Sequence, residues 1–267
     1  MSKKELDMSF LDHLEVLRWH LIRSGIAIIS LSILAFICKD FIFDTVLLAP
    51  KDPNFFTYKF LCNISQSLGM GDALCIKESP FLLMNITMSG QFSTHLMTSL
   101  YAGFILAFPY VFWEIWRFIV PALKDSETRV TRGVVFFSSF LFLIGILFGY
   151  YVIAPLSINF LGSYQVSQTV ANQISLTSFV TTVTTVSLAN GIIFELPILV
   201  YFLTKIGFLT PEFMRTYRRH AMVITLILSA VITPPDITSQ ILVSFPLIIL
   251  YEISIRISRA VIKRNNL

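Results

Sequence analysis

Glu195 is the only Asp, Glu, Lys, Arg or His within residues 133–204. Counted back from Lys205, which we expect at a membrane surface, it lies about 15 Å deep at 1.5 Å per residue. That depth is near the middle of a hydrocarbon layer about 30 Å thick, where a carboxyl group is costly and usually faces protein or a water-filled cavity. Glu195 therefore predicts a functional site inside the membrane. The alternative is a protonated glutamic acid that only bonds to a neighbouring helix.

The residues on either side of Glu195 favour an intramembrane groove. Pro197 lacks a backbone donor and should bend the helix two residues later. The preceding part of the helix is rich in hydroxyl groups, which can line a wet surface or bond to helix carbonyls. These residues are Thr177, Thr181, Thr182, Thr184, Thr185 and Ser187. Ordinary helix contact through small residues explains them equally well.

The composition is that of an integral membrane protein. Hydrophobic residues make up 55% of the 267 residues and charged residues 13%, whereas a soluble domain is about a quarter charged. Helices of about 20 residues use up nearly all of this length, so we expect a single all-α transmembrane domain over residues 1–267. The excess of basic residues indicates topology and not nucleic-acid binding.

Uncharged tracts predict six transmembrane helices after an amphipathic N-terminal helix at residues 5–21. A long outer loop covers residues 39–89, and a polar connection runs from Pro155 to Ser175. The tracts between charges that hold the last two spans contain only 16 and 15 residues, so these spans are short. The expected spans are residues 22–38, 91–116, 133–153, 176–204, 219–234 and 238–255.

The distribution of basic residues sets the orientation. With six crossings, all but four of the 20 Lys and Arg residues fall on one side of the membrane, and the exceptions are Lys39, Lys51, Lys59 and Lys77. Loops rich in Lys and Arg remain in the cytoplasm. Both termini are therefore predicted to be cytoplasmic, and the loop at residues 39–89 periplasmic.

Cys62 and Cys75 lie thirteen positions apart in this outer loop. If the loop faces an oxidising compartment they can form a disulfide, and the alternative is two free thiols. Two cysteines make a poor metal site, and the four histidines are scattered. Nothing in the sequence indicates a metal or cofactor.

Motifs of enzyme chemistry are absent: there is no phosphate loop, no His-Glu-x-x-His and no Gly-x-Ser-x-Gly. An enzyme is therefore disfavoured. A small secondary transporter or channel with Glu195 as a proton relay is the competing class. It would ordinarily contain internal repeats, which this sequence does not show.

Five short motifs, in this order and at matching topological positions, resemble the TatC family of the twin-arginine protein translocase. They are His13-Leu-Glu-Val-Leu-Arg18, Trp116-Arg-Phe-Ile-Val-Pro-Ala-Leu123 with Glu127 and Arg129, Phe194-Glu-Leu-Pro197, Thr233-Pro-Pro-Asp-Ile-Thr-Ser-Gln240 and Leu250-Tyr-Glu-Ile253. The resemblance covers nearly the whole chain. The insert that contains Cys62 and Cys75 departs from the family pattern.

The resemblance implies a six-span, glove-shaped receptor in the bacterial inner membrane. Such a receptor binds the twin-arginine signal peptides of folded proteins and works with single-span TatA or TatB-type partners, driven by the proton gradient. It also implies a homo-oligomer within the translocase.

The family pattern assigns roles to particular residues. It implies signal-peptide binding by Glu15, Arg18, Phe118, Pro121, Glu127 and Arg129, and contacts on the periplasmic side or with partners by Pro50, Asp236 and Gln240. Carboxylates suit arginine because guanidinium pairs with them bidentately. The pattern has glutamate at position 16, where this chain has Val16 and places Glu15 one residue earlier. Either Glu15 substitutes, which we favour, or Glu127 carries more of the binding.

Overall fold

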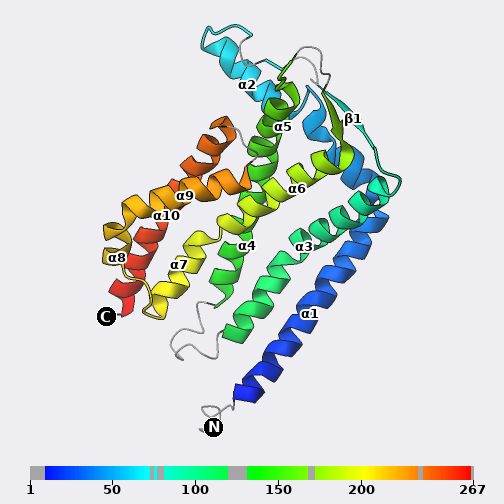
Figure 1. Ribbon diagram of the computed structural model, residues 1–267. Helices are drawn as coiled ribbons and strands as arrows, with labels where there is room; N and C mark the ends of the chain where they lie inside the picture. Colours follow the sequence, from blue (N-terminus) through cyan, green and yellow to red (C-terminus); the bar gives the residue numbers. More distant parts are fainter. Residues whose placement is uncertain are drawn as a thin grey trace. The chain divides into compact units, whose positions relative to one another are not determined.

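The computed structural model describes residues 10–72, 75–76, 81–119, 131–167, 172–233 and 237–265. The chain forms two compact units, one of residues 1–38 with 96–140 and the other of residues 39–95 with 141–267. Within the described ranges, five helical segments are long and apolar enough to cross a membrane (Figure 1). They are Leu14–Ile37, Gly90–Ile119, Gly133–Ser163, Leu176–Lys205 and Gln240–Lys263.

Helices α1 (Phe10–Ile37) and α3 (Gly90–Ile119) lie side by side. A Cβ atom at Gly103 would lie 2.6 Å from the backbone nitrogen of Ser32, so the absent side chain lets the two helices approach closely. Residues 10–21 of the predicted amphipathic helix continue into the first span and do not form a separate helix. No proline or glycine interrupts them, so the helical hydrogen bonds run on without a break.

The third span extends further than predicted. Helix α4 (Thr131–Phe148) continues through the wider turns of η5 (Gly149–Ile153) into α5 (Ala154–Ser163). The predicted polar connection from Pro155 therefore begins as helix, and span three does not end at residue 153. Pro155 is tolerated because it lies in the first turn of α5, directly after π-helical turns that leave room for its ring.

The fourth predicted span is broken in two. Helix α6 (Leu176–Ile193) begins with the Ser175 side chain accepting a hydrogen bond from the backbone nitrogen of Ser178. The helix ends before Glu195, and α7 (Leu196–Lys205) starts with Pro197 in its first turn. The bend predicted from Pro197 is thus confirmed.

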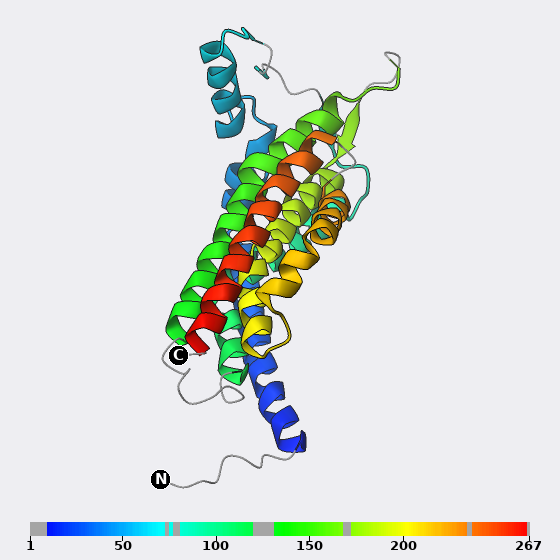
Figure 2. The same cartoon turned by 90° about the vertical axis from the view of Figure 1, so that its left-hand side faces the viewer.

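The C-terminal helices α8 (Pro211–Thr216), α9 (Arg218–Ile232) and α10 (Ile237–Asn265) follow. Helix α10 packs along α7 and α9, and Figure 2 shows all three at the same face. The fifth predicted span, residues 219–234, corresponds to α9, which is only 15 residues long and is not among the five candidate spans. A count of six crossings stays a prediction.

The segment of residues 39–89, which is predicted to form the outer loop, belongs to the second unit. It contains η1 (Phe41–Leu47), η2 (Ala49–Lys51), α2 (Phe56–Ser67) and β1 (Leu82–Met84), and β1 pairs in parallel with β2 (Gln173–Ser175). The sequence did not predict this short ladder. A buried cluster of Leu47, Phe81, Ala154, Ile158, Phe179, Val180 and Val183 joins the segment to α5 and α6.

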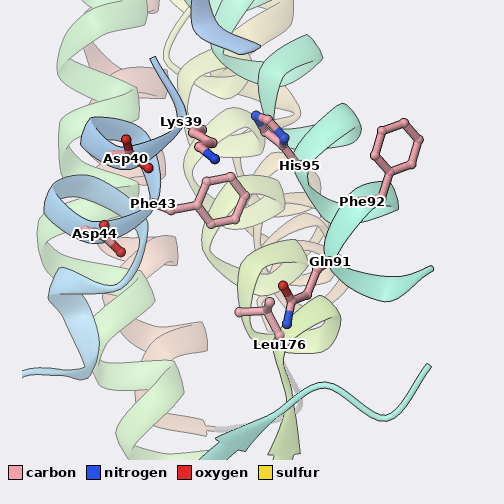
Figure 3. Close-up of a pocket in the computed structure, with 8 residues that line it drawn as sticks. All are labelled: Lys39, Asp40, Phe43, Asp44, Gln91, Phe92, His95 and Leu176. Atoms are coloured by element: carbon pink, nitrogen blue, oxygen red, sulfur yellow. The ribbon is translucent and has the colours of Figure 1, made fainter. Parts of the chain in front are cut away.

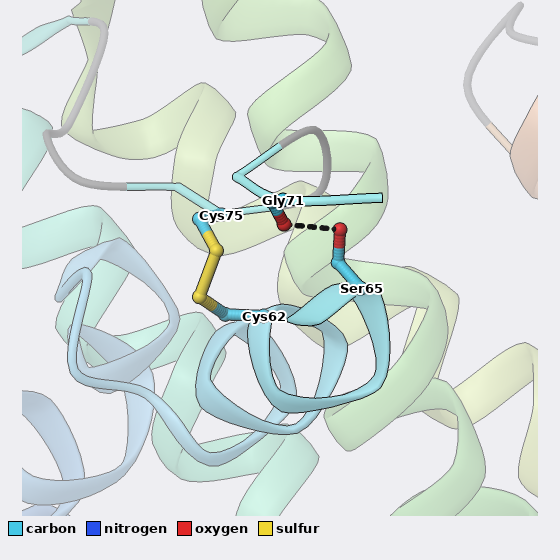
Figure 4. The surroundings of a disulfide bond; sticks show 4 residues. All are labelled: Cys62, Ser65, Gly71 and Cys75. Carbon is cyan, nitrogen blue, oxygen red and sulfur yellow. Dashed lines mark hydrogen bonds between the residues drawn. A yellow bond between two sulfur atoms is a disulfide. The ribbon is translucent and has the colours of Figure 1, made fainter. Parts of the chain in front are cut away.

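Helix α2 is held at both of its ends. The Tyr58 hydroxyl lies 2.9 Å from the carbonyl oxygens of both Pro50 and Pro155, and burial raises its pKa. At the other end, Cys62 and Cys75 form a disulfide with their Cα atoms 4.4 Å apart (Figure 4). Ser65 donates a hydrogen bond to the Gly71 carbonyl beside it.

Candidate functional site

A buried carboxylate joins α1 to α3 in the first unit. Glu114 is 1% exposed. One of its oxygens accepts a 2.9 Å hydrogen bond from the Tyr110 hydroxyl, one turn earlier on α3. Its other oxygen contacts Nδ1 of His20 on α1. A buried carboxylate needs such partners, because leaving a buried charge uncompensated costs several kcal/mol.

This contact fixes the part of α1 that carries the family motif. His20 also meets the Phe118 ring edge-on at 6.1 Å, one turn after Glu114. The last turns of α3, which precede the second loop, therefore contact α1 at His20. This residue lies one turn after Val16. Sequence reasoning missed His20 and Glu114. The signal that identified Glu195 was an acidic residue isolated in an apolar tract. The same signal was available for Glu114, because it is the only Asp or Glu within residues 79–116.

The charged residues predicted to bind a signal peptide are accessible where the structure describes them. Glu15 and Arg18 are exposed on α1, and the Arg18 guanidinium lies 5.8 Å from the Trp19 ring centre. Val16 is half-buried. Among residues 14–37 of α1, the exposed carboxylate is thus at position 15. The other three residues predicted for this site lie outside the described ranges, and they are Pro121, Glu127 and Arg129.

Glu195 occupies the break between α6 and α7 in the second unit. Its side chain is half-buried, and Pro197 is fully buried in the next turn. A hydrogen bond of 2.9 Å between the Thr204 and Ser258 hydroxyls fastens α7 to α10. Glu195 therefore lies at a helix break, and the helix that follows this break is fixed to α10.

Close packing of small residues places this break against the third span. A Cβ atom at Gly145 would lie 2.6 Å from the Asn190 carbonyl oxygen, and one at Gly149 would lie 2.7 Å from the Ser187 Cα atom. Asn190 is fully buried and donates to the Val186 carbonyl at 2.8 Å. Backbones that approach this closely leave α6 little freedom beside Glu195.

Five of the six hydroxyl groups named above for α6 divide into two sets, and the sixth, on the half-buried Thr182, donates to the Ser178 carbonyl at 2.9 Å. Thr184 and Ser187 are buried and bond to carbonyls one turn earlier, at 2.8 and 2.7 Å. Thr177, Thr181 and Thr185 are exposed and follow one another at four-residue intervals. The first of these also lies 3.0 Å from the Thr94 hydroxyl. The buried hydroxyl groups bond to helix carbonyls, and a groove along the exposed set stays a prediction.

The residues predicted on the periplasmic side are placed as follows. Pro50 is fully buried. The Gln240 amide donates to the Leu226 carbonyl at 3.3 Å and so links α10 to α9. Asp236 lies outside the described ranges. Among the residues described, no three His, Cys, Asp or Glu side chains are grouped to hold a metal ion.

Comparison with known proteins agrees with this architecture. The family model described as Sec-independent protein translocase protein (TatC) matches residues 12–246. The protein of that name from Blattabacterium sp. subsp. Periplaneta americana is 39% identical over 99% of this chain and 100% of its own length. The one from Aquifex aeolicus is 34% identical over 93% of each chain.

A solved structure extends the agreement to three dimensions. The crystal structure of the twin-arginine translocase receptor TatC superposes with a TM-score of 0.70 at 32% identity, covering 93% of this chain and 99% of that one. Matches of this length in sequence and in fold leave one assignment: the chain belongs to the TatC family of Sec-independent protein translocase proteins.

Proposed function

We propose that this chain is the receptor subunit of a twin-arginine translocase and binds the arginine pair of signal peptides with Glu15 and Glu127. The observation that carries the proposal is the His20–Glu114 contact. It fixes the exposed Glu15 on α1 beside the end of α3, and Glu127 follows that end by eight residues. Eight residues span at most about 28 Å, so the second loop can reach the same face.

Chemistry supports arginine as the ligand at this face. Guanidinium groups pair with carboxylates through two parallel hydrogen bonds, and lysine cannot reproduce that geometry. Glu15 is exposed, so it can meet a peptide without first breaking an internal contact. The half-buried Val16 cannot supply this charge, and Glu15 takes the role that the family pattern gives to the next position.

The apolar part of the signal peptide enters a groove that contains Glu195 in this proposal. Glu195 follows directly on α6, which exposes Thr177, Thr181 and Thr185. Side chains that are polar and exposed within a membrane span suit a surface that meets peptide or water. Pro197 fixes the break that presents the carboxylate.

The proposal includes the location and the partners. The chain is a multi-pass membrane protein, and we assign it to the bacterial cytoplasmic membrane with both termini in the cytoplasm, following the distribution of basic residues. Helix α9 then makes a sixth crossing of about 22 Å, shorter than the bilayer core. This short helix thins the bilayer locally beside α9 and α10. The single-span TatA or TatB-type partners bind at this edge of the protein.

Photocrosslinking of a twin-arginine peptide to the protein in membranes tests the receptor function. Label on the N-terminal segment and the second loop is expected with an Arg-Arg peptide and not with a Lys-Lys peptide. Glu15→Ala and Glu127→Ala should each reduce the label, and together they should abolish it. Glu212→Ala removes another exposed carboxylate, on α8, and serves as the matched control. A double variant that binds the Arg-Arg peptide as tightly as the parent would contradict the proposal.

Site-specific crosslinking tests the partner edge separately. Probes at Val223 and Ile227, both exposed on α9, should capture the partner helix. Probes at Ile29 and Ile33, equally exposed on α1, are the control. Capture only at α1 would assign the partner to a different edge and leave the peptide site unaffected.

A further inference from the structure

A pocket of about 300 Å³ lies in the second unit, between residues 39–44 and the first turns of α3 and α6 (Figure 3). It is lined by Lys39, Asp40, Phe43, Asp44, Gln91, Phe92, His95 and Leu176. The Phe43 ring meets the His95 ring edge-on at 5.7 Å and forms one wall. A volume at the lower end of the range for small-molecule sites suits a compact polar group.

The lining residues place the pocket at the boundary between lipid and water. Lys39 follows the first candidate span by two residues, Gln91 is the second residue of the next span, and Leu176 is the first residue of the fourth. The parallel strands β1 and β2 lie a few residues before α3 and α6 and hold these ends together. Phospholipid headgroups occupy this depth.

The pocket carries both signs of charge. Figure 3 shows the Lys39 and His95 side chains pointing toward one another beside Phe43, with Asp40 and Asp44 one turn apart on the same segment as Lys39. Lysine and histidine can donate to a phosphate, whereas the two carboxylates attract a primary ammonium group. One lysine against two aspartates disfavours a ligand that carries only negative charge.

We propose that this pocket binds the headgroup of phosphatidylethanolamine from the outer leaflet. The phosphate accepts hydrogen bonds from Lys39 and His95, and the ammonium group lies against Asp40 and Asp44. The acyl chains run down past Phe92, which is 63% exposed at the edge of the pocket. This inference is independent of the signal-peptide proposal, because no residue of that site lines the pocket.

Native mass spectrometry of the whole protein in detergent tests the proposal. The protein is titrated with phosphatidylethanolamine, phosphatidylcholine and phosphatidylglycerol of identical acyl chains. Phosphatidylethanolamine is expected to bind at least about fivefold more tightly than the others. Phosphatidylcholine cannot donate hydrogen bonds from its quaternary ammonium group, and phosphatidylglycerol has no cation. Equal affinity for all three lipids would overturn the proposal.

Variants locate the binding. Lys39→Gln and Asp44→Asn should each weaken phosphatidylethanolamine binding about fivefold, and Asp44→Lys should shift the preference to phosphatidylglycerol. Lys59→Gln removes an exposed lysine of the same outer segment and should change nothing. These side chains are at the surface, and helical circular dichroism confirms that each variant is folded.

Two further outcomes would overturn the assignment. The first is unchanged lipid binding in Lys39→Gln and Asp44→Lys. The second is displacement of the lipid by millimolar inorganic phosphate, which would assign the pocket to a soluble anion. We expect no displacement, because free phosphate offers neither the ammonium group nor the acyl chains.

Discussion

Replacing Gly145 with alanine is expected to separate α4 from α6 beside Glu195. The new Cβ atom would lie 2.6 Å from the Asn190 carbonyl oxygen, 2.8 Å from the Gly191 Cα atom and 2.9 Å from the Phe194 Cβ atom. Two of these three atoms belong to the backbone and cannot rotate away. The helices must therefore move apart by several tenths of an ångström, at a cost of about 1–3 kcal/mol.

Gly133 on the same helix is the matched control, because a Cβ atom there has nothing within 4 Å. Alanine raises helix propensity at either position by up to about 1 kcal/mol, so the gain largely cancels when the two variants are compared. The difference between them, about 1–3 kcal/mol, then measures the close approach. Equilibrium unfolding in mixed micelles, followed by circular dichroism, gives both values.

The variants Gly145→Ala and Gly133→Ala also test whether the packing of α4 against α6 affects signal-peptide binding. Gly145→Ala should also weaken crosslinking of the signal peptide's apolar region near Glu195, whereas Gly133→Ala should leave it unchanged. If Gly145→Ala unfolds at the same denaturant concentration as Gly133→Ala, the close approach does not determine the position of the break, and our reasoning about Glu195 is refuted.

Three further substitutions test contacts that hold distant elements together. His20→Ala should lower the free energy of unfolding by about 3 kcal/mol, because it leaves the buried Glu114 carboxylate without its partner, and adding Glu114→Gln should recover much of the loss. Tyr58→Phe should lower the free energy of unfolding by about 1–2 kcal/mol at neutral pH, because it removes the hydroxyl's hydrogen bonds. Because burial raises the pKa of Tyr58, the hydroxyl's contribution is complete below pH 10 and declines above it, so the parent and the variant should converge in alkaline unfolding experiments. Reducing the disulfide between Cys62 and Cys75, which are 13 residues apart in the sequence, should lower the free energy of unfolding by about 3 kcal/mol. The protein with both cysteines replaced by serine should be insensitive to reductant.

The span positions could be predicted because charge and hydrophobicity act locally. Residues 91–116 and 176–204 were predicted as spans, and the helical segments run from Gly90 to Ile119 and from Leu176 to Lys205. The break near Glu195 followed from the missing backbone donor of Pro197. In each case the effect is local to the chain and does not depend on what the helix packs against.

Predictions failed where the outcome depended on neighbouring structure. Pro155 was taken as the end of a helix, yet the π-helical turns of η5 accommodate its ring, and α5 continues to Ser163. The β1–β2 ladder joins segments about 90 residues apart in the sequence, and neither is long enough to show an alternating pattern. Such contacts leave no local signal in the sequence.

The two isolated glutamates show how much depends on distant partners. Glu114 and Glu195 are each the only acidic residue in a long apolar tract. Glu114 lies near the end of α3, and its charge is compensated by Tyr110 and by His20, which is 94 residues away. Glu195 sits at a helix break that is followed by a proline, and its side chain is half-buried. Glu114 thus stabilises the pairing of two helices, and the break at Glu195 is the feature that our proposal uses for peptide recognition.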